Sequence, residues 1–139
     1  MTISMYDACV KPGMRMMANL AALLEKAAHH AEERKIDPAV FVGARLAPDM
    51  FPLSRQVQIA SDSAKIGAAR LAGVTPPPYE DSETTLGELI ERTRRTLDYL
   101  ATLSPSQFEG AENREIRWKS PVQGERSMIG LPYLLHHVL

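Results

Sequence analysis

The histidines of this chain are the side chains best suited to bind a metal ion, and they occur as two adjacent pairs, His29-His30 and His136-His137. Neighbouring residues on a helix point about 100° apart, so an adjacent pair does not chelate one ion. Metal sites on helices use ligands three or four residues apart. His29 and Glu33 have that spacing, but the charged residues around them predict a solvated helix end. The His136-His137 segment is more apolar, so one of its histidines should face inward as a candidate metal ligand.

Polar residues also gather in the middle of residues 49–73, which is the most regular helical segment of the chain. Its apolar or small residues recur in alternating steps of four and three, the pattern of a helix packed in a bundle. Gln56, Gln58 and Asp62 interrupt this segment with polar side chains, which on a central helix either face water or line a site. We therefore take Gln56, Gln58 and Asp62, together with Trp118, as candidate binding residues.

No catalytic nucleophile can be recognised. The sequence has no G-x-S-x-G motif, no phosphate-binding glycine loop and no zinc-type cysteine pair. The single cysteine, Cys9, excludes an internal disulfide, fits a reducing compartment and is expected to be a small apolar residue of the first helix. The catalytic residues are therefore unknown, and any activity would need a site assembled across several helices.

Length and composition predict one globular domain over residues 1–139, with 45% hydrophobic and 24% charged residues. Sixteen Lys and Arg balance 17 Asp and Glu for a net charge of −1, which argues against nucleic acid as a partner. No apolar run is long enough to span a membrane, and the N-terminus lacks the layout of a signal peptide. We expect a cytoplasmic protein.

Helical periodicity predicts a first helix over residues 5–34, capped by Thr2 or Ser4, with a kink or short break at Pro12-Gly13. A short helix is expected over residues 39–46. Asp49 is the predicted N-cap of the next long helix.

Gly73 is expected to end that long helix. The segment VTPPPYEDSE then predicts a stiff, extended spacer between antiparallel helices. Thr85 and Glu88 predict a capping box that starts a helix over residues 85–103. Its cluster Arg92, Arg94 and Arg95 is typical of a solvated face.

The remainder of the chain predicts a small β excursion and a last helix. Residues 115–119 alternate between polar and apolar, and residues 125–129 could return beside them, with Trp118 covering one end of the bundle. A helix beginning at Gly130 should bury an apolar side; its members are Leu131, Leu134, Leu135 and Val138. Because this helix stops after barely two turns, we expect it to be incomplete.

Four stretches carry a resemblance to a known family: TISMYDA, RLAPDMFPLSRQVQIASDSAKIGAARLAG, ATLSPSQFEGAE and GLPYLLHHVL. Over most of its length the chain resembles a bacterial family of unknown function within the DinB/YfiT-like superfamily of metal-dependent four-helix bundles. The resemblance implies an up-down bundle with a long crossover and a small β excursion before the last helix. It also implies that relatives are usually longer at the C-terminus.

The resemblance further implies a divalent metal held by one histidine of the second long helix and two histidines, four apart, of the last helix. Residues 49–73 contain no histidine, and Gln56 or Gln58 occupies the region where one is expected. A glutamine carbonyl binds zinc or nickel less strongly than imidazole does. Only His136 and His137 remain on the last helix. A divalent metal is therefore a cofactor that the sequence leaves undecided, and the residues present do not favour it.

These observations lead to an all-α, antiparallel up-down four-helix bundle with a short β-hairpin-like excursion before the last helix. Two functions stay open. We prefer a small-ligand-binding or assembly module with a degenerate metal site. We expect this module to be a homodimer and to have a small molecule as its partner. The alternative is a divergent metal-dependent, thiol-transferase-like enzyme with His136 or His137 as a ligand. Three convergent ligands around an ion would favour the enzyme.

Overall fold

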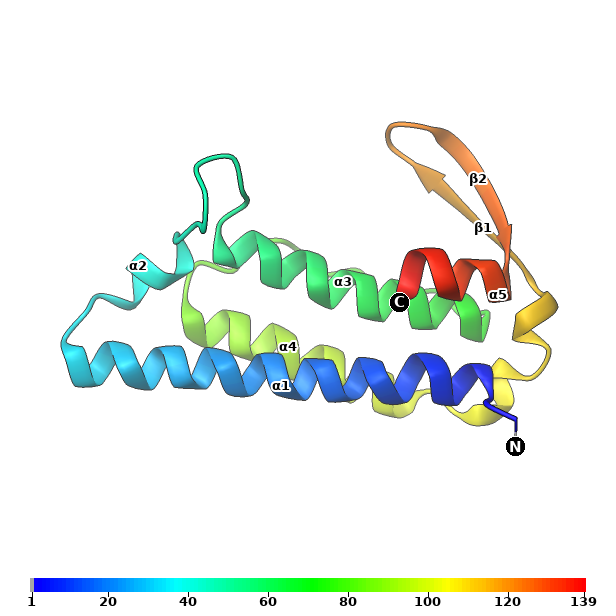
Figure 1. The fold of residues 1–139 in the computed structure, drawn as a ribbon, viewed down its shortest axis with the longest axis horizontal. Coiled ribbons are helices and arrows are strands. Elements are labelled where there is room, and N and C mark those ends of the chain that lie inside the picture. The colour runs from blue at the N-terminus through cyan, green and yellow to red at the C-terminus, as the bar shows by residue number, and fades with distance from the viewer. Residues whose placement is uncertain (1) are drawn as a thin grey trace.

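The computed structural model describes residues 2–139 and is mostly helical (Figure 1). The first helix, α1 (Met5–Arg34), has the predicted bounds, and the Ser4 hydroxyl accepts a hydrogen bond from the Asp7 N–H at 3.0 Å. The break predicted at Pro12-Gly13 does not occur: α1 continues through Pro12. A Cβ at Gly13 would already touch Leu100, so α1 lies close against another long helix here. That packing offsets the one backbone hydrogen bond that proline removes.

Two elements are shorter than the sequence predicted. α2 (Pro38–Val42) is capped by Asp37 and covers only part of residues 39–46. α3 (Leu53–Ala72) begins at Leu53, directly after Pro52, so Asp49 is not its N-cap. Gly73 ends α3 in the left-handed conformation (φ +73°), as predicted.

The next long helix, α4 (Leu86–Thr102), begins with the predicted capping box: the Glu88 N–H donates to the Thr85 hydroxyl, and the Glu88 carboxylate accepts from the Thr85 N–H. Glu88 also accepts from the Thr84 N–H at 2.6 Å, and this bond is the main cause of a lowered Glu88 pKa. The start of α4 is therefore fixed by local sequence.

The long helices are not all antiparallel, which corrects the predicted up-down order. α1 is antiparallel to α4, since Gly13 lies against Leu100 and Glu25 pairs with Arg94. However, α3 and α4 run in the same direction, and residues 74–85 cross back along the molecule between them (Figure 1). This segment is a long crossover and not a spacer between antiparallel helices. An extended proline-rich chain rises about 3.1 Å per residue, enough to return along a helix of about 30 Å.

After α4, the short helical turns η1 (Pro105–Phe108) and η2 (Ala111–Asn113) lead into a β-hairpin. β1 (Glu115–Ser120) pairs antiparallel with β2 (Gly124–Ile129), with Trp118 opposite Arg126, and the predicted two-stranded excursion is confirmed. The chain then enters α5 (Gly130–Tyr133) and the π-helical segment η3 (Leu134–Val138).

The last helical segment lies antiparallel along α3, where Gly67 approaches Val138 and Arg70 contacts Tyr133. Its buried side differs from the prediction. Tyr133 and Leu134 are buried, whereas Leu131 and Leu135 are exposed. The π-helical turn changes the residue spacing from the 3.6 period on which the prediction rested.

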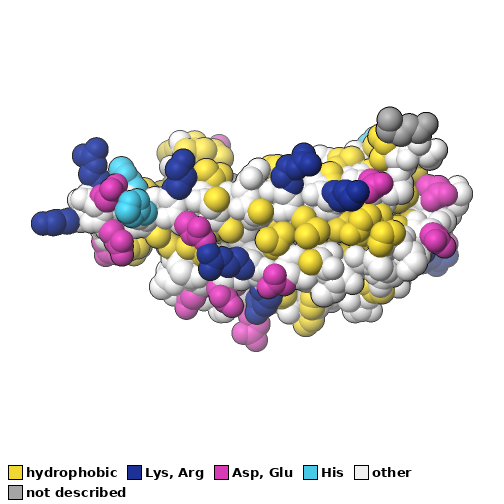
Figure 2. Space-filling model, turned by 90° about the horizontal axis from the view of Figure 1, so that it is seen from below, with side chains coloured by type: hydrophobic (Ala, Val, Ile, Leu, Met, Phe, Trp, Pro, Cys, Tyr) yellow, Lys and Arg dark blue, Asp and Glu magenta, His cyan; other side chains and the backbone are white. Residues whose placement is uncertain are grey.

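Two apolar clusters stabilise this arrangement. The larger joins α1, α3, α4, η1, the hairpin and α5, and the smaller joins α1, α2, α3 and α4 around Leu24 and Leu89. On the face shown in Figure 2, hydrophobic side chains form a band between scattered charged groups. None of the helices within residues 2–139 has the length and apolar character needed to cross a lipid bilayer.

Candidate functional site

A buried arginine lies between α3, α4 and the crossover. Arg92 is 1% exposed, and its Nε donates to the Ser61 hydroxyl at 2.7 Å. Its guanidinium pairs with three carboxylates, Asp62 at 2.9 Å, Asp81 at 3.0 Å and Glu83 at 3.1 Å. Burial lowers the Arg92 pKa, but the Glu83 hydrogen bond and the three carboxylates outweigh it and raise the pKa overall. Arg92 thus stays charged and fastens the crossover to the helices.

Lys65 extends this cluster along α3. It is 2% exposed, and its ammonium lies 3.2 Å from Asp62 and 3.5 Å from the ring centre of Tyr79. Burial lowers the pKa of Lys65, and the Asp62 hydrogen bond opposes the shift. The guanidinium carbon of Arg95 lies 4.0 Å from the centre of the same Tyr79 ring. The cluster therefore anchors the aromatic residue of the crossover between cations.

The two candidate glutamines lie apart. Gln58 is buried, donates to Glu83 at 3.0 Å and accepts from Arg55 at 3.4 Å, so it belongs to the Arg92 cluster. Gln56 is exposed and bonds only to the Phe51 carbonyl at 3.5 Å. It lines an apolar recess of about 380 Å³; the other lining residues are Phe41, Ala44, Arg45, Leu46, Met50, Phe51 and Leu53.

A separate groove of about 250 Å³ lies between α3 and the α5–η3 segment. We call it the α3–α5 groove; it is lined by Ile59, Asp62, Ser63, Ile66, Gly67, Arg70, Tyr133 and His137. Asp62 belongs both to this groove and to the Arg92 cluster. The structure therefore brings two sequence candidates, Asp62 and His137, to one site.

Two aromatic side chains of the α3–α5 groove, Tyr133 and His137, belong to a cluster with Trp118. The His137 ring stacks on Tyr133 with ring centres 5.4 Å apart, and Trp118 meets both edge-on, at 5.3 Å from Tyr133 and 5.1 Å from His137. Arg70 reaches this cluster from α3, donating to the Tyr133 hydroxyl at 3.2 Å with its guanidinium 5.5 Å from the Trp118 ring centre. A third sequence candidate, Trp118, thus joins the site through the hairpin.

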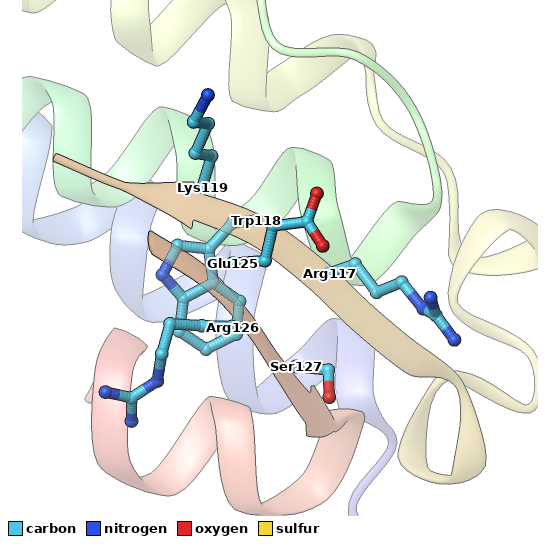
Figure 3. Close-up of a pocket in the computed structure, with 6 residues that line it drawn as sticks. All are labelled: Arg117, Trp118, Lys119, Glu125, Arg126 and Ser127. Carbon is cyan, nitrogen blue, oxygen red and sulfur yellow. The ribbon is translucent and has the colours of Figure 1, made fainter. Parts of the chain in front are cut away.

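The hairpin presents Trp118 to α5 from one of its two faces. Figure 3 shows Trp118 of β1 and Arg126 of β2 pointing to the same side, toward α5, while Arg117 and Lys119 point away. Side chains alternate between the faces of a strand, so residue spacing sets this division. Both faces border a hollow of about 470 Å³ at the hairpin.

The residues of the α3–α5 groove do not fit a divalent metal. Asp62 and His137 are its only lining residues with groups that commonly ligate zinc or nickel. The Asp62 carboxylate is already paired with Arg92 and Lys65, and His137 is packed as an aromatic ring. His136 and His137 are both exposed, so the prediction that one of them faces inward is wrong, and His136 does not line the groove. Residues 2–139 contain no cluster of three histidine, cysteine, aspartate or glutamate side chains suited to an ion.

The sequence did not reveal Arg70, Tyr133 or Arg92. Arg92 lies three residues after Leu89 and four residues before Thr96, which places it on the buried stripe of α4. This spacing could have predicted its burial from the sequence. The prediction that Arg92 belongs to a solvated face is therefore wrong, although Arg94 and Arg95 are exposed. No local pattern indicates that Arg70 meets Tyr133, which is 63 residues later.

Comparison with known proteins adds two findings. The family model described as a domain of unknown function, DUF1993, matches residues 5–139. A crystal structure of a DinB family member protein from Shewanella denitrificans matches with a TM-score of 0.85 and 42% sequence identity, covering 96% of this chain and 75% of that one. No protein of curated function matches.

Proposed function

Because this chain belongs to the DUF1993 family and has a DinB-like fold, we propose that it is a small-ligand-binding protein. The proposed binding site is the α3–α5 groove, with Asp62, Arg70, Trp118, Tyr133 and His137 as its functional side chains. The site takes the place of a metal centre and does not depend on a metal. Residues 1–139 act as one domain.

The observation that carries this proposal is the convergence of aromatic rings and a cation on one small groove. Ligand sites are concave and largely apolar, with a few polar groups that orient the ligand. Here Tyr133 and His137 line the groove with Trp118 packed edge-on against both, and Arg70 supplies charge. The volume of about 250 Å³ suits a ligand smaller than a typical drug-sized molecule.

The proposal includes the architecture and the assembly state. We take α1, α3, α4 and the α5–η3 segment as the four members of a helical bundle. We also propose a homodimer formed through α1, whose Met16 and Leu23 are each 61% exposed and lie seven residues apart on one face. We further propose that the protein is cytoplasmic, which the single cysteine, Cys9, fits because it forms no internal disulfide.

The proposal can be tested with the full chain, purified without an affinity tag. Trp118 is the only tryptophan, so its emission reports directly on the groove. A library of small metabolites is titrated while this emission and the amide NMR signals of α3 are followed. Ser63→Phe should fill the groove and abolish binding. Gln56→Phe is the matched control, on the same face of α3 two turns earlier, and should bind normally.

Metal content provides the opposing test. Elemental analysis after incubation with zinc, nickel or manganese should find less than stoichiometric metal. Stoichiometric metal in the unmodified chain, lost in His137→Gln but kept in His136→Gln, would overturn the proposal in favour of a metal-dependent enzyme. Ligand binding that Ser63→Phe leaves unchanged would place the binding site elsewhere and also overturn it.

A further inference from the structure

Resting on the α3–α5 groove as the ligand site, we propose that the ligand is a small planar carboxylate. Arg70 binds the carboxylate group, and the aromatic cluster of Trp118, Tyr133 and His137 supports the flat body of the ligand. Arginine is suited to this role because its planar guanidinium matches a carboxylate with two parallel hydrogen bonds.

The main support is that Arg70 lines the groove without a carboxylate partner. Within residues 2–139, Arg70 forms no ion pair, and its one hydrogen bond is from Nη1 to the neutral Tyr133 hydroxyl at 3.2 Å. By contrast, Arg92 and Lys65 are paired with Asp62, and Arg55 is paired with Asp81. Arg70 therefore keeps donors at Nε and Nη2 for a ligand.

The nearest acidic side chain does not cancel this positive charge. Asp62 lines the same groove, but its carboxylate lies 2.9 Å from Arg92 and 3.2 Å from Lys65. Two buried cations thus already compensate it. The Tyr133 hydroxyl accepts from Arg70 and still has its own proton to donate to a ligand oxygen. The charge left over in the groove is positive.

The surroundings of Arg70 favour a flat ligand with a single negative charge. Tyr133 and His137 stack on one another with their planes inclined by 20°, and Trp118 meets both edge-on, so the cluster offers ring edges and the outer face of the exposed His137 to a flat ligand. Arg126 lies on the same side of the hairpin as Trp118 (Figure 3). Its guanidinium is bonded to Gln123, and it does not line the α3–α5 groove. Among the lining residues of the groove, Arg70 is the one arginine or lysine, and a single cation suits a carboxylate better than a doubly charged phosphate.

The test compares three probes of similar shape: benzoate, its neutral analogue benzamide, and phenyl phosphate. Binding is measured from Trp118 emission and from amide NMR shifts of α3 and α5. Benzoate should bind at least about tenfold more tightly than benzamide, because a hydrogen bond to an ionised group is stronger than one to a neutral group. Benzoate should also bind more tightly than phenyl phosphate. Tighter binding of phenyl phosphate would overturn the assignment of a carboxylate.

Variants of Arg70 connect the preference to one side chain. Arg70→Gln should weaken benzoate binding at least about tenfold and leave benzamide unchanged. Arg70→Lys should recover part of the loss, since the charge returns without the planar pair of donors. Arg117→Gln removes a charge from the outward face of the hairpin and should bind benzoate normally. Thermal unfolding of each variant confirms that the fold is intact.

The possible failures can be told apart. If benzoate and benzamide bind equally, are unaffected by Arg70→Gln and are both lost in Ser63→Phe, the carboxylate assignment is wrong and the groove remains the ligand site. If neither probe binds at millimolar concentration, the carboxylate assignment is overturned. The metabolite library with Ser63→Phe then decides the proposed function separately.

Discussion

At the scale of single residues, the most unusual feature is a fully buried arginine held by three carboxylates. Arg92 joins Asp62 of α3 to Asp81 and Glu83 of the crossover, and this arrangement shares one positive charge among three carboxylates from two segments. A buried ion pair adds little compared with apolar packing, but removing one partner leaves uncompensated charge in the interior. Arg92 therefore matters most for keeping the crossover in place.

Arg92→Met should destabilise the protein by about 3–5 kcal/mol, because the buried Glu83 would lose its countercharge and Asp62 would lose one of its two. Urea unfolding followed by circular dichroism measures the change. Arg94→Met is the control: Arg94 pairs with Glu25 at the surface and should cost no more than about 1 kcal/mol. Equal losses for the two variants would contradict a structural role of the buried network.

Cys9 allows a prediction about pH. Burial raises the pKa of its thiol from 9.0 to about 12, so the folded protein binds the thiol proton more tightly than the unfolded chain does. The contribution to stability is complete below pH 9 and is lost as the pH rises toward 12, by about 1.4 kcal/mol per pH unit. In Cys9→Ala, unfolding free energies measured between pH 8 and 11 should show a shallower decline than the unmodified chain.

The same burial predicts an inert thiol. At pH 8 Cys9 should react with a disulfide reagent only after urea unfolds the chain, since the thiolate is the reactive form. Rapid labelling of the folded protein would show that the first helix opens locally.

At the scale of elements, the position of α5 decides whether the groove exists. Gly130 begins α5, its N–H donates to the Arg114 carbonyl at 2.8 Å, and its Cα faces the Ala111 carbonyl so closely that a Cβ would collide with that oxygen. The hairpin, η2 and α5 therefore meet at a point where only glycine fits. This contact sets where Tyr133 and His137 lie along α3.

Gly130→Ala should displace α5, destabilise the protein by about 1–3 kcal/mol and shift the emission of Trp118 to longer wavelength as its aromatic contacts loosen. Fluorescence and thermal unfolding provide the readouts. In Gly87→Ala the nearest atom is 3.9 Å away, and this helix substitution should be neutral or stabilising by up to about 1 kcal/mol. An unchanged Trp118 spectrum in Gly130→Ala would contradict the proposed anchoring of α5.

At the scale of the whole molecule, the crossover determines the helix arrangement. Because residues 74–85 return along the bundle, α3 can lie parallel to α4 on one side and antiparallel to the α5–η3 segment on another (Figure 1). α1 packs mainly on α4, which leaves Met16 and Leu23 exposed on its outer face. Such spaced apolar side chains are typical of a helix that contacts another copy.

Leu23→Glu should convert a homodimer into a monomer, because a carboxylate would be buried without a partner. Size-exclusion chromatography with light scattering measures the mass. Val122→Glu, also an exposed apolar residue but in the hairpin turn, should leave the mass unchanged. A monomeric unmodified chain at micromolar concentration would contradict the proposed dimer.

The sequence by itself determined most of the elements. Serine and threonine caps, the capping box of Thr85 and Glu88 and the stop at Gly73 fixed most helix ends, and alternation fixed the hairpin. These features arise from interactions among neighbouring residues, so local patterns contain them.

Only the tertiary structure decided the direction of α3 relative to α4, the burial of Arg92 and the meeting of Arg70 with Tyr133 and Trp118. Each depends on segments far apart in the chain. An arginine on a helix is stable in contact with water, and it is also stable in the interior when carboxylates pair with it. The local residue spacing does not say where the carboxylates of a crossover will lie. The groove exists because α3 and the α5–η3 segment meet in space.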